Sequence, residues 1–386
     1  MPPSVGGVDC GAFRSYNESM KITLQMQLVP TSEQREVLLS TMERFNAAAS
    51  FAAKTGFDAG VFSQPSIHKL AYQEIRSRFG LSAQMAVRAI GKAVETFKRD
   101  RSKCPAFKPR GAVTYDERIL SFKGLDKVSL WTLSGRMVLA MVYGEYQGQR
   151  FDRIKGQVDL VYRGSKFYLY ATVDLPDKAP IEPKDWIGVD LGIVNLATDS
   201  DGNTYSGDAV EKVRRRRHES RRSYQKTGTK SAKRRLKKMA RREANFRRNE
   251  NHRISNELVR LAKGTDRGIA LEDLKGIRER TTVRARDRAK HSGWAFAQLQ
   301  AFVCYKAKRA GIPAAFVDAR NTSRTCSACG HCEKDNRKSQ ADFACKHCGF
   351  SENADRNAAR NVRARAVVKR PDLAANVDPG LRSRAS

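Results

Sequence analysis

Three acidic residues have the types and the settings that metal-dependent chemistry requires. Asp190 lies in the segment WIGVDLG, Glu272 in GIALEDL and Asp355 in ENADRNAARN. The first two lie in apolar runs and the third opens an Ala-rich one, so a folded core could bring the three carboxylates together. Crowded carboxylates resist joint ionisation, and a cluster of them at the edge of a core implies bound cations. The pattern therefore predicts metal-dependent chemistry on phosphodiesters.

Magnesium is the expected cation of this site. Mg²⁺ prefers a few hard carboxylate oxygens together with water and phosphate, so three acids suffice. Two ions about 3.5–4 Å apart can hold a scissile phosphate, one activating a water and the other stabilising the departing 3′-oxyanion. We expect Asp190 to bridge both ions. The structural alternative makes Asp190 a surface acid, Glu272 a helix-start charge and Asp355 the N-cap of the last helix.

A cysteine cluster predicts a second metal site. Five of the eight cysteines fall within residues 326–348, and two CxxC pairs there are separated by fifteen residues. This is the spacing of a zinc ribbon, and four thiolates leave no open position for water, so we expect one structural zinc ion. The predicted ligands are Cys326, Cys329, Cys345 and Cys348.

Other zinc ligands remain possible at this cluster. Cys332 follows Cys329 at the same CxxC spacing, and His331 or His347 could replace a cysteine. The motifs CSACG and CKHCG each place a glycine after the second cysteine, where a tight turn directs backbone N–H groups toward the sulfurs. These glycines favour the symmetric pair of CxxC motifs.

The charge of the chain predicts nucleic acid as its partner. Across 386 residues, Lys and Arg exceed Asp and Glu by 73 to 41, giving a net charge of +32. Residues 212–248 contain eighteen Lys or Arg and only two acids. We interpret this run as a surface that binds along a phosphate backbone. We expect a packed helix in its second half and a flexible loop at 214–230. The alternative is a solvated helix face or a disordered arm. Its candidate contacts are Arg214, Arg215, Arg216, Arg234, Arg235, Lys238 and Arg241.

Four residues nearer the amino terminus could read a short DNA motif. Gln84 and Arg88 lie on a predicted helix, and Lys108 and Arg110 follow the segment PAF. Gln and Arg can make bidentate contacts to bases in a major groove. The alternative is that they are ordinary solvent-facing side chains.

The chain shows no signal for a membrane or for secretion. No apolar run approaches the roughly 18–20 residues of a membrane span, and the first twenty residues lack an apolar signal segment. The local cysteine cluster fits a metal site better than a disulfide framework. We therefore expect a cytoplasmic protein, in the bacterial cytosol or nucleoid.

Hydrophobic periodicity predicts a multidomain α/β protein. A three-strand meander that carries Asp190 is followed by alternating helices and strands, with Glu272 on the fourth strand and Asp355 at the last helix; this is the order of an RNase H-like fold. Short strands near the amino terminus predict a partly open β-barrel with a helical insertion. The expected parts are a disordered leader (1–19), a barrel (20–30 and 104–180), a helical insertion (31–103), a split nuclease-like domain (181–320 and 350–370), a zinc ribbon (321–349) and a disordered tail (371–386). The expected leader leaves open whether translation starts at Met1 or Met20.

Several motifs together resemble a known family. GVDLGIVNLATDSDG, ALEDLKG, TSRTCSACG and CKHCGFSENADRNAARNV closely resemble the split RuvC nuclease and inserted zinc ribbon of the TnpB (OrfB) proteins of small insertion sequences, which are related to type V CRISPR effectors. The resemblance spans about residues 181–367 and, more loosely, 20–180. One departure is that Asn353 and Ala354 precede Asp355, where many members carry a further charged residue.

The resemblance implies an RNA-guided DNA endonuclease encoded by a transposable element. It implies a guide RNA and a double-stranded DNA target as partners, a wedge-like barrel whose helical insertion reads a flanking motif, and a monomer in the ribonucleoprotein. By motif position, Asp190, Glu272 and Asp355 take the catalytic roles. The alternatives are a miniature type V CRISPR effector, a nuclease-inactive RNA-guided regulator and a transposase that joins DNA ends.

Overall fold

The computed structural model describes residues 20–176, 178–277, 295–339 and 341–368. They form two compact units, Asn17–Pro176 and a second unit that contains the described residues from 178 onward. The expected leader at 1–19 and tail at 371–386 lie outside the described residues. None of the described helices combines the length and the apolar character needed to cross a membrane.

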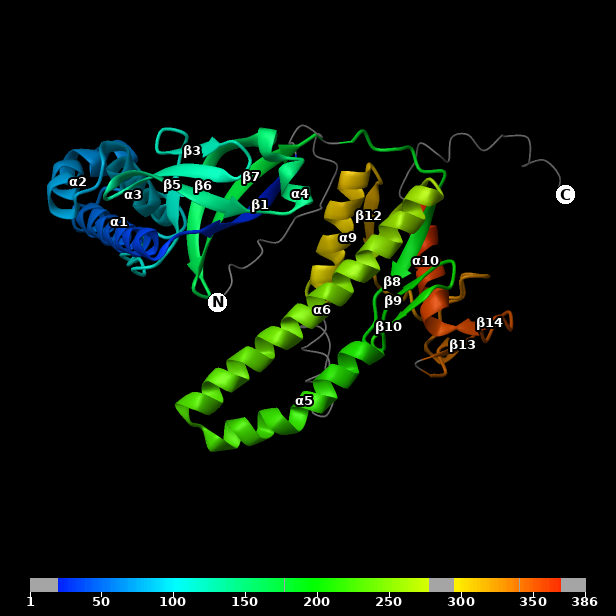
Figure 1. The fold of residues 1–386 in the computed structure, drawn as a ribbon. Coiled ribbons are helices and arrows are strands. Elements are labelled where there is room, and N and C mark those ends of the chain that lie inside the picture. Colours follow the sequence, from blue (N-terminus) through cyan, green and yellow to red (C-terminus); the bar gives the residue numbers. More distant parts are fainter. Residues whose placement is uncertain (1–19, 177, 278–294, 340, 369–386) are drawn as a thin grey trace. The chain divides into compact units, whose positions relative to one another are not determined.

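The first unit is built on a curved antiparallel sheet that forms a nearly closed barrel (Figure 1). Its strand order is β2-β6-β7-β1-β5-β4-β3. β1 (Met20–Val29) lies between β7 (Lys166–Leu175) and β5 (Gly135–Val142), which confirms that the distant first strand joins the barrel. The remaining strands are β2 (Val113–Tyr115), β3 (Leu120–Lys123), β4 (Lys127–Thr132) and β6 (Ile154–Arg163), with the short helices α4 (Glu145–Gly148) and η1 (Phe151–Arg153) before β6.

Three helices are inserted between β1 and β2. They are α1 (Ser32–Asp58), α2 (Gln64–Phe79) and α3 (Ala83–Phe97). Thr31 begins α1 with a capping box, because its hydroxyl accepts from the Gln34 amide while the Gln34 side chain accepts from the Thr31 N–H. The helices and the barrel share one apolar core, so the insertion is packed as part of the unit; its members include Phe45, Met85, Phe97, Val113, Leu130 and Phe167.

The second unit is organised by a mixed five-stranded sheet with the order β10-β9-β8-β11-β12. β8 (Asp185–Asp190), β9 (Asn195–Asp199) and β10 (Thr204–Ser206) form the predicted antiparallel meander. β11 (Arg267–Asp273) is parallel to β8 and to β12 (Ala314–Asp318). This order confirms the predicted RNase H-like (RuvC) arrangement.

Helices cover both faces of this sheet. Ile187, Val189 and Leu271 pack on one face against α6 (Lys230–Gly264) and α9 (Phe296–Ala310). Trp186 and Ala270 pack on the opposite face against α10 (Ala354–Val368), which confirms the expected final helix. Because side chains alternate along a strand, β8 and β11 are buried on both sides.

The prediction of a loop at residues 214–230 is wrong. Residues Asp208–Thr227 form α5, Gly228 ends it in the left-handed conformation, and Thr229 caps α6, so the basic run is a helical hairpin (Figure 1). Arg and Lys have high helix propensity, and the buried carboxylate of Glu243 on α6 accepts from Arg221 on α5 at 2.6 Å. The loop was expected because helical apolar spacing is confined to the second half of the run, and this bridge instead fixes the first half to that helix.

Gly188 sets how closely α10 approaches β8. A Cβ atom at this position would lie 2.0 Å from the Ala359 carbonyl oxygen and 2.4 Å from the Arg363 nitrogen, both backbone atoms of α10. Neither atom can move without shifting the helix. Only glycine therefore permits the observed contact.

We predict that Gly188→Ala lowers the free energy of unfolding by about 3 kcal/mol, because overpacking against backbone forces the helix away from the strand. Urea unfolding monitored by circular dichroism measures the change. Gly264→Ala is the matched control, since a Cβ at that position meets nothing within 4 Å. Equal stability of the Gly188→Ala and wild-type proteins would contradict the close approach.

Candidate functional site

Two of the three predicted acids lie side by side at the ends of parallel strands. The register of β8 and β11 pairs Val189 with Leu271, and Asp190 and Glu272 are the next residue of each strand. Alternation places both side chains on the face covered by α10. Glu272 is buried whereas Asp273 is exposed, as expected for neighbours in an extended chain.

The third acid, Asp355, lies in the first turn of α10 and is buried. The side-chain oxygen of Asn353 accepts from the backbone N–H groups of Asp355, at 3.0 Å, and of Arg356, at 3.2 Å. Asn353 therefore caps the helix, so the alternative that Asp355 is its N-cap is wrong. The Asp355 carboxylate instead remains available to the sheet.

Glu272 and Asp355 are close enough to Asp190 to perturb its carboxylate. Burial raises the pKa of Asp190 well above its usual value, and the negative charges of Glu272 and Asp355 raise it further. Burial also raises the pKa of Glu272, and the hydrogen bond from Thr322 opposes that change. Crowded acids of this kind favour a bound cation, which offsets their repulsion.

Hydrogen-bond donors from three other segments hold these acids. Asn195, at the start of β9, donates to one oxygen of Asp355 at 2.8 Å, and Arg337 lies 3.4 Å from the other. The hydroxyl of Thr322 donates to Glu272 at 2.6 Å. The sequence carries no signal for these three residues, because each comes from a loop or strand end with no periodic pattern.

The carboxylates and the four predicted thiols differ in how tightly they converge. In the described ranges, the four thiols are the one group of three or more candidate ligands whose atoms all lie within 4.8 Å of one another. The acids interact through their charges but do not form so tight a set. Their hard oxygen donors nevertheless suit Mg²⁺, whereas the thiols suit zinc.

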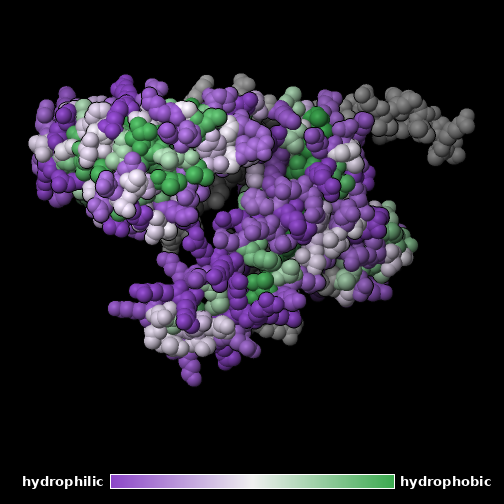
Figure 2. All heavy atoms as spheres, viewed as in Figure 1, coloured by the Kyte–Doolittle hydropathy of each residue, from purple (hydrophilic) through white to green (hydrophobic). Residues whose placement is uncertain are grey.

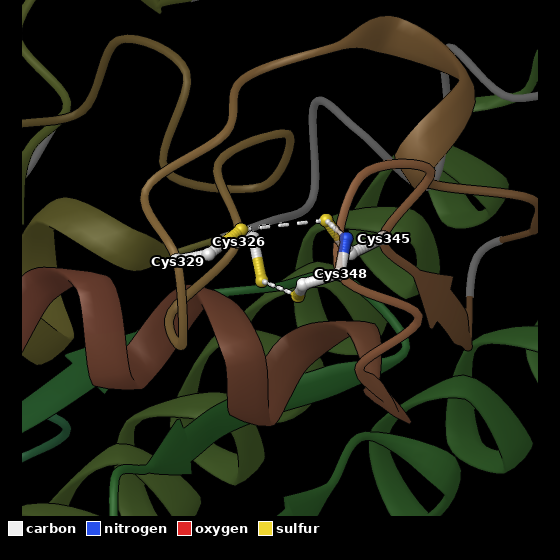
Figure 3. Close-up of side chains that lie close together, drawn as sticks. All are labelled: Cys326, Cys329, Cys345 and Cys348. Carbon is white, nitrogen blue, oxygen red and sulfur yellow. Dashed lines mark hydrogen bonds between the residues drawn. The ribbon is translucent and has the colours of Figure 1, made fainter.

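The four-cysteine cluster joins two loops whose sulfurs face one another (Figure 3). Cys326 Sγ lies 3.7 Å from Cys348 Sγ, and Cys329 Sγ lies 3.6 Å from Cys345 Sγ. The backbone N–H of Cys348 lies 3.5 Å from Cys345 Sγ and lowers the pKa of the Cys345 thiol to about 6. Burial raises the pKa of the Cys326 thiol, and a bound cation would offset that change. The set therefore suits a structural zinc ion.

Both CxxC loops have the turn geometry that their glycines predicted. Gly330 and Gly349 have φ angles of 78° and 73°, and their N–H groups donate to the carbonyls of Cys326 and Cys345. Cys332 is exposed and lies outside the cluster. The rings of His331 and His347 stack on each other with their centroids 5.4 Å apart, and neither ring belongs to the cluster. The structure thus assembles the symmetric ligand set. Around it lie η3 (Lys334–Asn336) and the paired strands β13 (Asp342–Ala344) and β14 (Ser351–Asn353).

Three of the four predicted DNA-reading residues of the first unit have intramolecular partners. Gln84 and Arg88 on α3 both bond the Asp116 carboxylate, the second at 2.9 Å. Arg110 bonds Glu43 at 3.0 Å. Lys108 is exposed. These observations give the positions of the four residues, and their role in reading DNA remains a prediction.

The basic residues of the helical hairpin divide into two groups. Arg214 and Arg215 both bond Glu211, whereas no ion pair of Arg234, Lys238 or Arg241 occurs within the described part of the chain. Arg235 donates to the Tyr224 hydroxyl at 3.3 Å, and Arg216 is exposed. Hydrophilic side chains cover much of the visible surface of this hairpin (Figure 2). The second group is therefore the more available to a phosphate backbone.

Comparison with known proteins identifies two family segments. Residues 170–275 match the model of the OrfB family, described as probable transposases, and residues 296–362 match the Cas12f1-like TNB domain. Two segments of the chain are therefore similar to the OrfB and the Cas12f1-like families, respectively. The first segment contains Asp190 and Glu272, and the second contains all four cluster cysteines and Asp355.

Individual relatives agree with this assignment. The chain is 27% identical over 305 residues to the "Putative RNA-guided DNA endonuclease InsQ" of Escherichia coli K12, covering 73% of each protein. It is also 32% identical over 218 residues to the CRISPR-associated endodeoxyribonuclease Cas12f1 of Sulfoacidibacillus thermotolerans. That match covers 52% of this chain and only 50% of the relative. The solved structure of the mini-RNA-guided endonuclease CRISPR-Cas_phi3 shares its fold, with a TM-score of 0.55 at 12% identity over 92% of this chain and 93% of that one.

We predict that Cys345→Ser lowers bound zinc from about one ion per chain and lowers the melting temperature, because a structural zinc site contributes directly to folding. Metal analysis and thermal unfolding measure the two effects. Cys332→Ser is the matched control and should keep both values. Loss of zinc in the Cys332→Ser protein alone would instead support the alternative ligand register.

Proposed function

We propose that the chain is an RNA-guided DNA endonuclease encoded by a transposable element. In this proposal it cleaves double-stranded DNA next to a short flanking motif by two-metal-ion chemistry. The observation that carries the proposal is the convergence of Asp190, Glu272 and Asp355 on one face of an RNase H-like sheet. The relation to InsQ, which covers most of both chains, supports the guided activity.

The charge balance of the acid site supports a divalent metal. Ionisation of the Asp190 carboxyl group is disfavoured at this position, because burial and two neighbouring carboxylates raise its pKa. Asp190, Glu272 and Asp355 would hold the metal through their oxygens. Bound Mg²⁺ supplies an activated water and a counter-charge for the phosphate. The residues of the chain orient the acids: Asn195 and Arg337 hold Asp355, while Thr322 holds Glu272.

The composition supports a guide RNA and a double-stranded DNA target as partners. A net charge of +32 suits the neutralisation of several phosphate backbones, and base pairing to a guide supplies sequence choice without many base-reading side chains. The helical hairpin α5–α6 offers a basic surface for one of these backbones. Such contacts position a nucleic acid and do not read its sequence.

A miniature type V CRISPR effector is the second candidate, and its support is the 32% identity to Cas12f1. Both candidates use the same chemistry and differ in the source of the guide. Sequencing the RNA that copurifies with the protein from its host separates them. An RNA that maps beside its own gene supports the transposon origin, and repeat-array transcripts support the CRISPR origin.

We predict that Asp190→Ala abolishes Mg²⁺-dependent cleavage and leaves RNA and target binding unchanged, because it removes a metal ligand and no phosphate contact. Gel-based cleavage and filter binding measure the two properties. Asp273→Asn is the matched control, since this acid is exposed beside Glu272 and should be dispensable. Cleavage by the Asp190→Ala protein at the wild-type rate would refute the site assignment.

A further prediction concerns the hairpin. Replacing Arg234 and Lys238 with Gln should reduce the slope of log affinity against log salt for a double-stranded DNA oligonucleotide by about 2, or about one per lost phosphate contact. Replacing Arg214 and Arg215 with Gln should change it less, because Glu211 already neutralises part of their charge. Equal slopes in the wild-type protein and both variants would remove the hairpin from the interface.

A further inference from the structure

A buried, uncharged residue, Thr322, contacts the acid site. Thr322 lies in the loop between β12 and the cysteine cluster and is 4% exposed. Its hydroxyl lies 2.6 Å from Glu272 Oε1 and 3.1 Å from the Ala319 carbonyl oxygen. A hydroxyl has one proton, and the shorter contact to a charged acceptor is the stronger. The Thr322 proton is therefore directed mainly at Glu272.

Two asparagines of α10 hold the backbone on which Thr322 lies. The Asn361 side-chain amide donates to the carbonyls of Thr322, at 2.9 Å, and of Thr325, at 2.7 Å. The Asn357 amide donates to the Thr325 carbonyl at 2.8 Å, and its oxygen accepts from the Ser327 N–H at 2.9 Å. Both asparagines are buried. The loop is thus fixed to the helix that also carries Asp355.

The same loop runs directly into the four-cysteine cluster. Cys326 lies between Thr325 and Ser327, the two residues whose backbone groups Asn357 binds. Through this path the position of Cys326 is tied to α10, and α10 is tied to Thr322. Loop, helix and cluster form one connected set of hydrogen bonds that ends on the Glu272 carboxylate.

We propose that Thr322 is a positioning residue of the acid site, and that Asn357 and Asn361 couple its position to the cysteine cluster. The inference rests on the proposed metal-dependent function. Thr322 occupies Oε1 of Glu272 and leaves the other oxygen to coordinate a cation. Residues that orient a metal ligand in this way commonly change metal affinity or activity by about 10–100-fold when they are replaced.

The test compares Thr322→Val, which removes the hydroxyl at nearly constant shape, with Thr322→Ser, which keeps it. Binding of Mn²⁺ to the zinc-loaded full chain is measured by electron paramagnetic resonance, and the binding that Asp190→Ala removes defines the acid site. We expect Thr322→Val to weaken that binding and to slow cleavage by roughly tenfold or more. Thr322→Ser should restore both, and zinc content should not change.

Thr198→Val is the matched control. Its hydroxyl is also buried, in the strand beside Asp190, but has no hydrogen-bond partner among the residues that the structure describes, so its loss should leave Mn²⁺ affinity and cleavage unchanged. Unchanged Mn²⁺ affinity in Thr322→Val would overturn the proposal, as would an equal loss in Thr198→Val or a failure of Thr322→Ser to restore binding. If the wild-type protein cleaves no DNA, the proposed function fails, while the Mn²⁺ comparison still tests Thr322.

The coupling through α10 has its own test. Asn361→Ala should weaken Mn²⁺ binding in the same direction as Thr322→Val, because the loop loses two of its hydrogen bonds. The double variant Thr322→Val/Asn361→Ala should bind Mn²⁺ no more weakly than Thr322→Val alone, since both changes act through one hydroxyl. Fully additive losses would show that Asn361 acts by another route and would overturn the coupling.

Discussion

The repulsion among three crowded carboxylates is the constraint on which the second unit depends. Asp190, Glu272 and Asp355 raise the free energy of the folded chain wherever they are brought together without a counter-charge. The fold holds them in place by parallel strands with a fixed register and by a helix packed directly on one of those strands. Gly188 is central to this arrangement, because the absence of a Cβ lets α10 touch β8 two residues before Asp190.

Helix α10 and the residue that caps it combine several tasks within residues 353–361. Asn353 begins it, Asp355 faces the sheet, and Asn357 and Asn361 bind the loop that leads into the cysteine cluster. The zinc-type cluster in turn closes the two loops on either side of Arg337, which reaches Asp355. A metal that stabilises the folded loops is therefore connected to the geometry of the acids.

The basic side chains of the surface differ in whether an acidic partner already neutralises them. Part of it is satisfied internally, as in the pairing of Arg221 with Glu243 across the hairpin and of Arg88 with Asp116 in the first unit. The remaining exposed cations are those free to meet phosphates. The ion pair between the two helices of the hairpin also lowers its internal repulsion, because the buried Glu243 carboxylate offsets nearby positive charge.

Much of the fold and the site was determined by the sequence alone. Alternation and turn residues predicted the meander, the barrel strands and the last helix, and CxxC spacing predicted the thiol cluster, because these signals are local. The sequence also marked the three acids by their apolar settings. Only the tertiary structure revealed Thr322, Asn195 and Arg337 beside them, since a hydrogen bond between residues far apart leaves no periodic trace. The helical hairpin likewise contains a contact between Arg221 and Glu243, 22 residues apart, that no local pattern predicts.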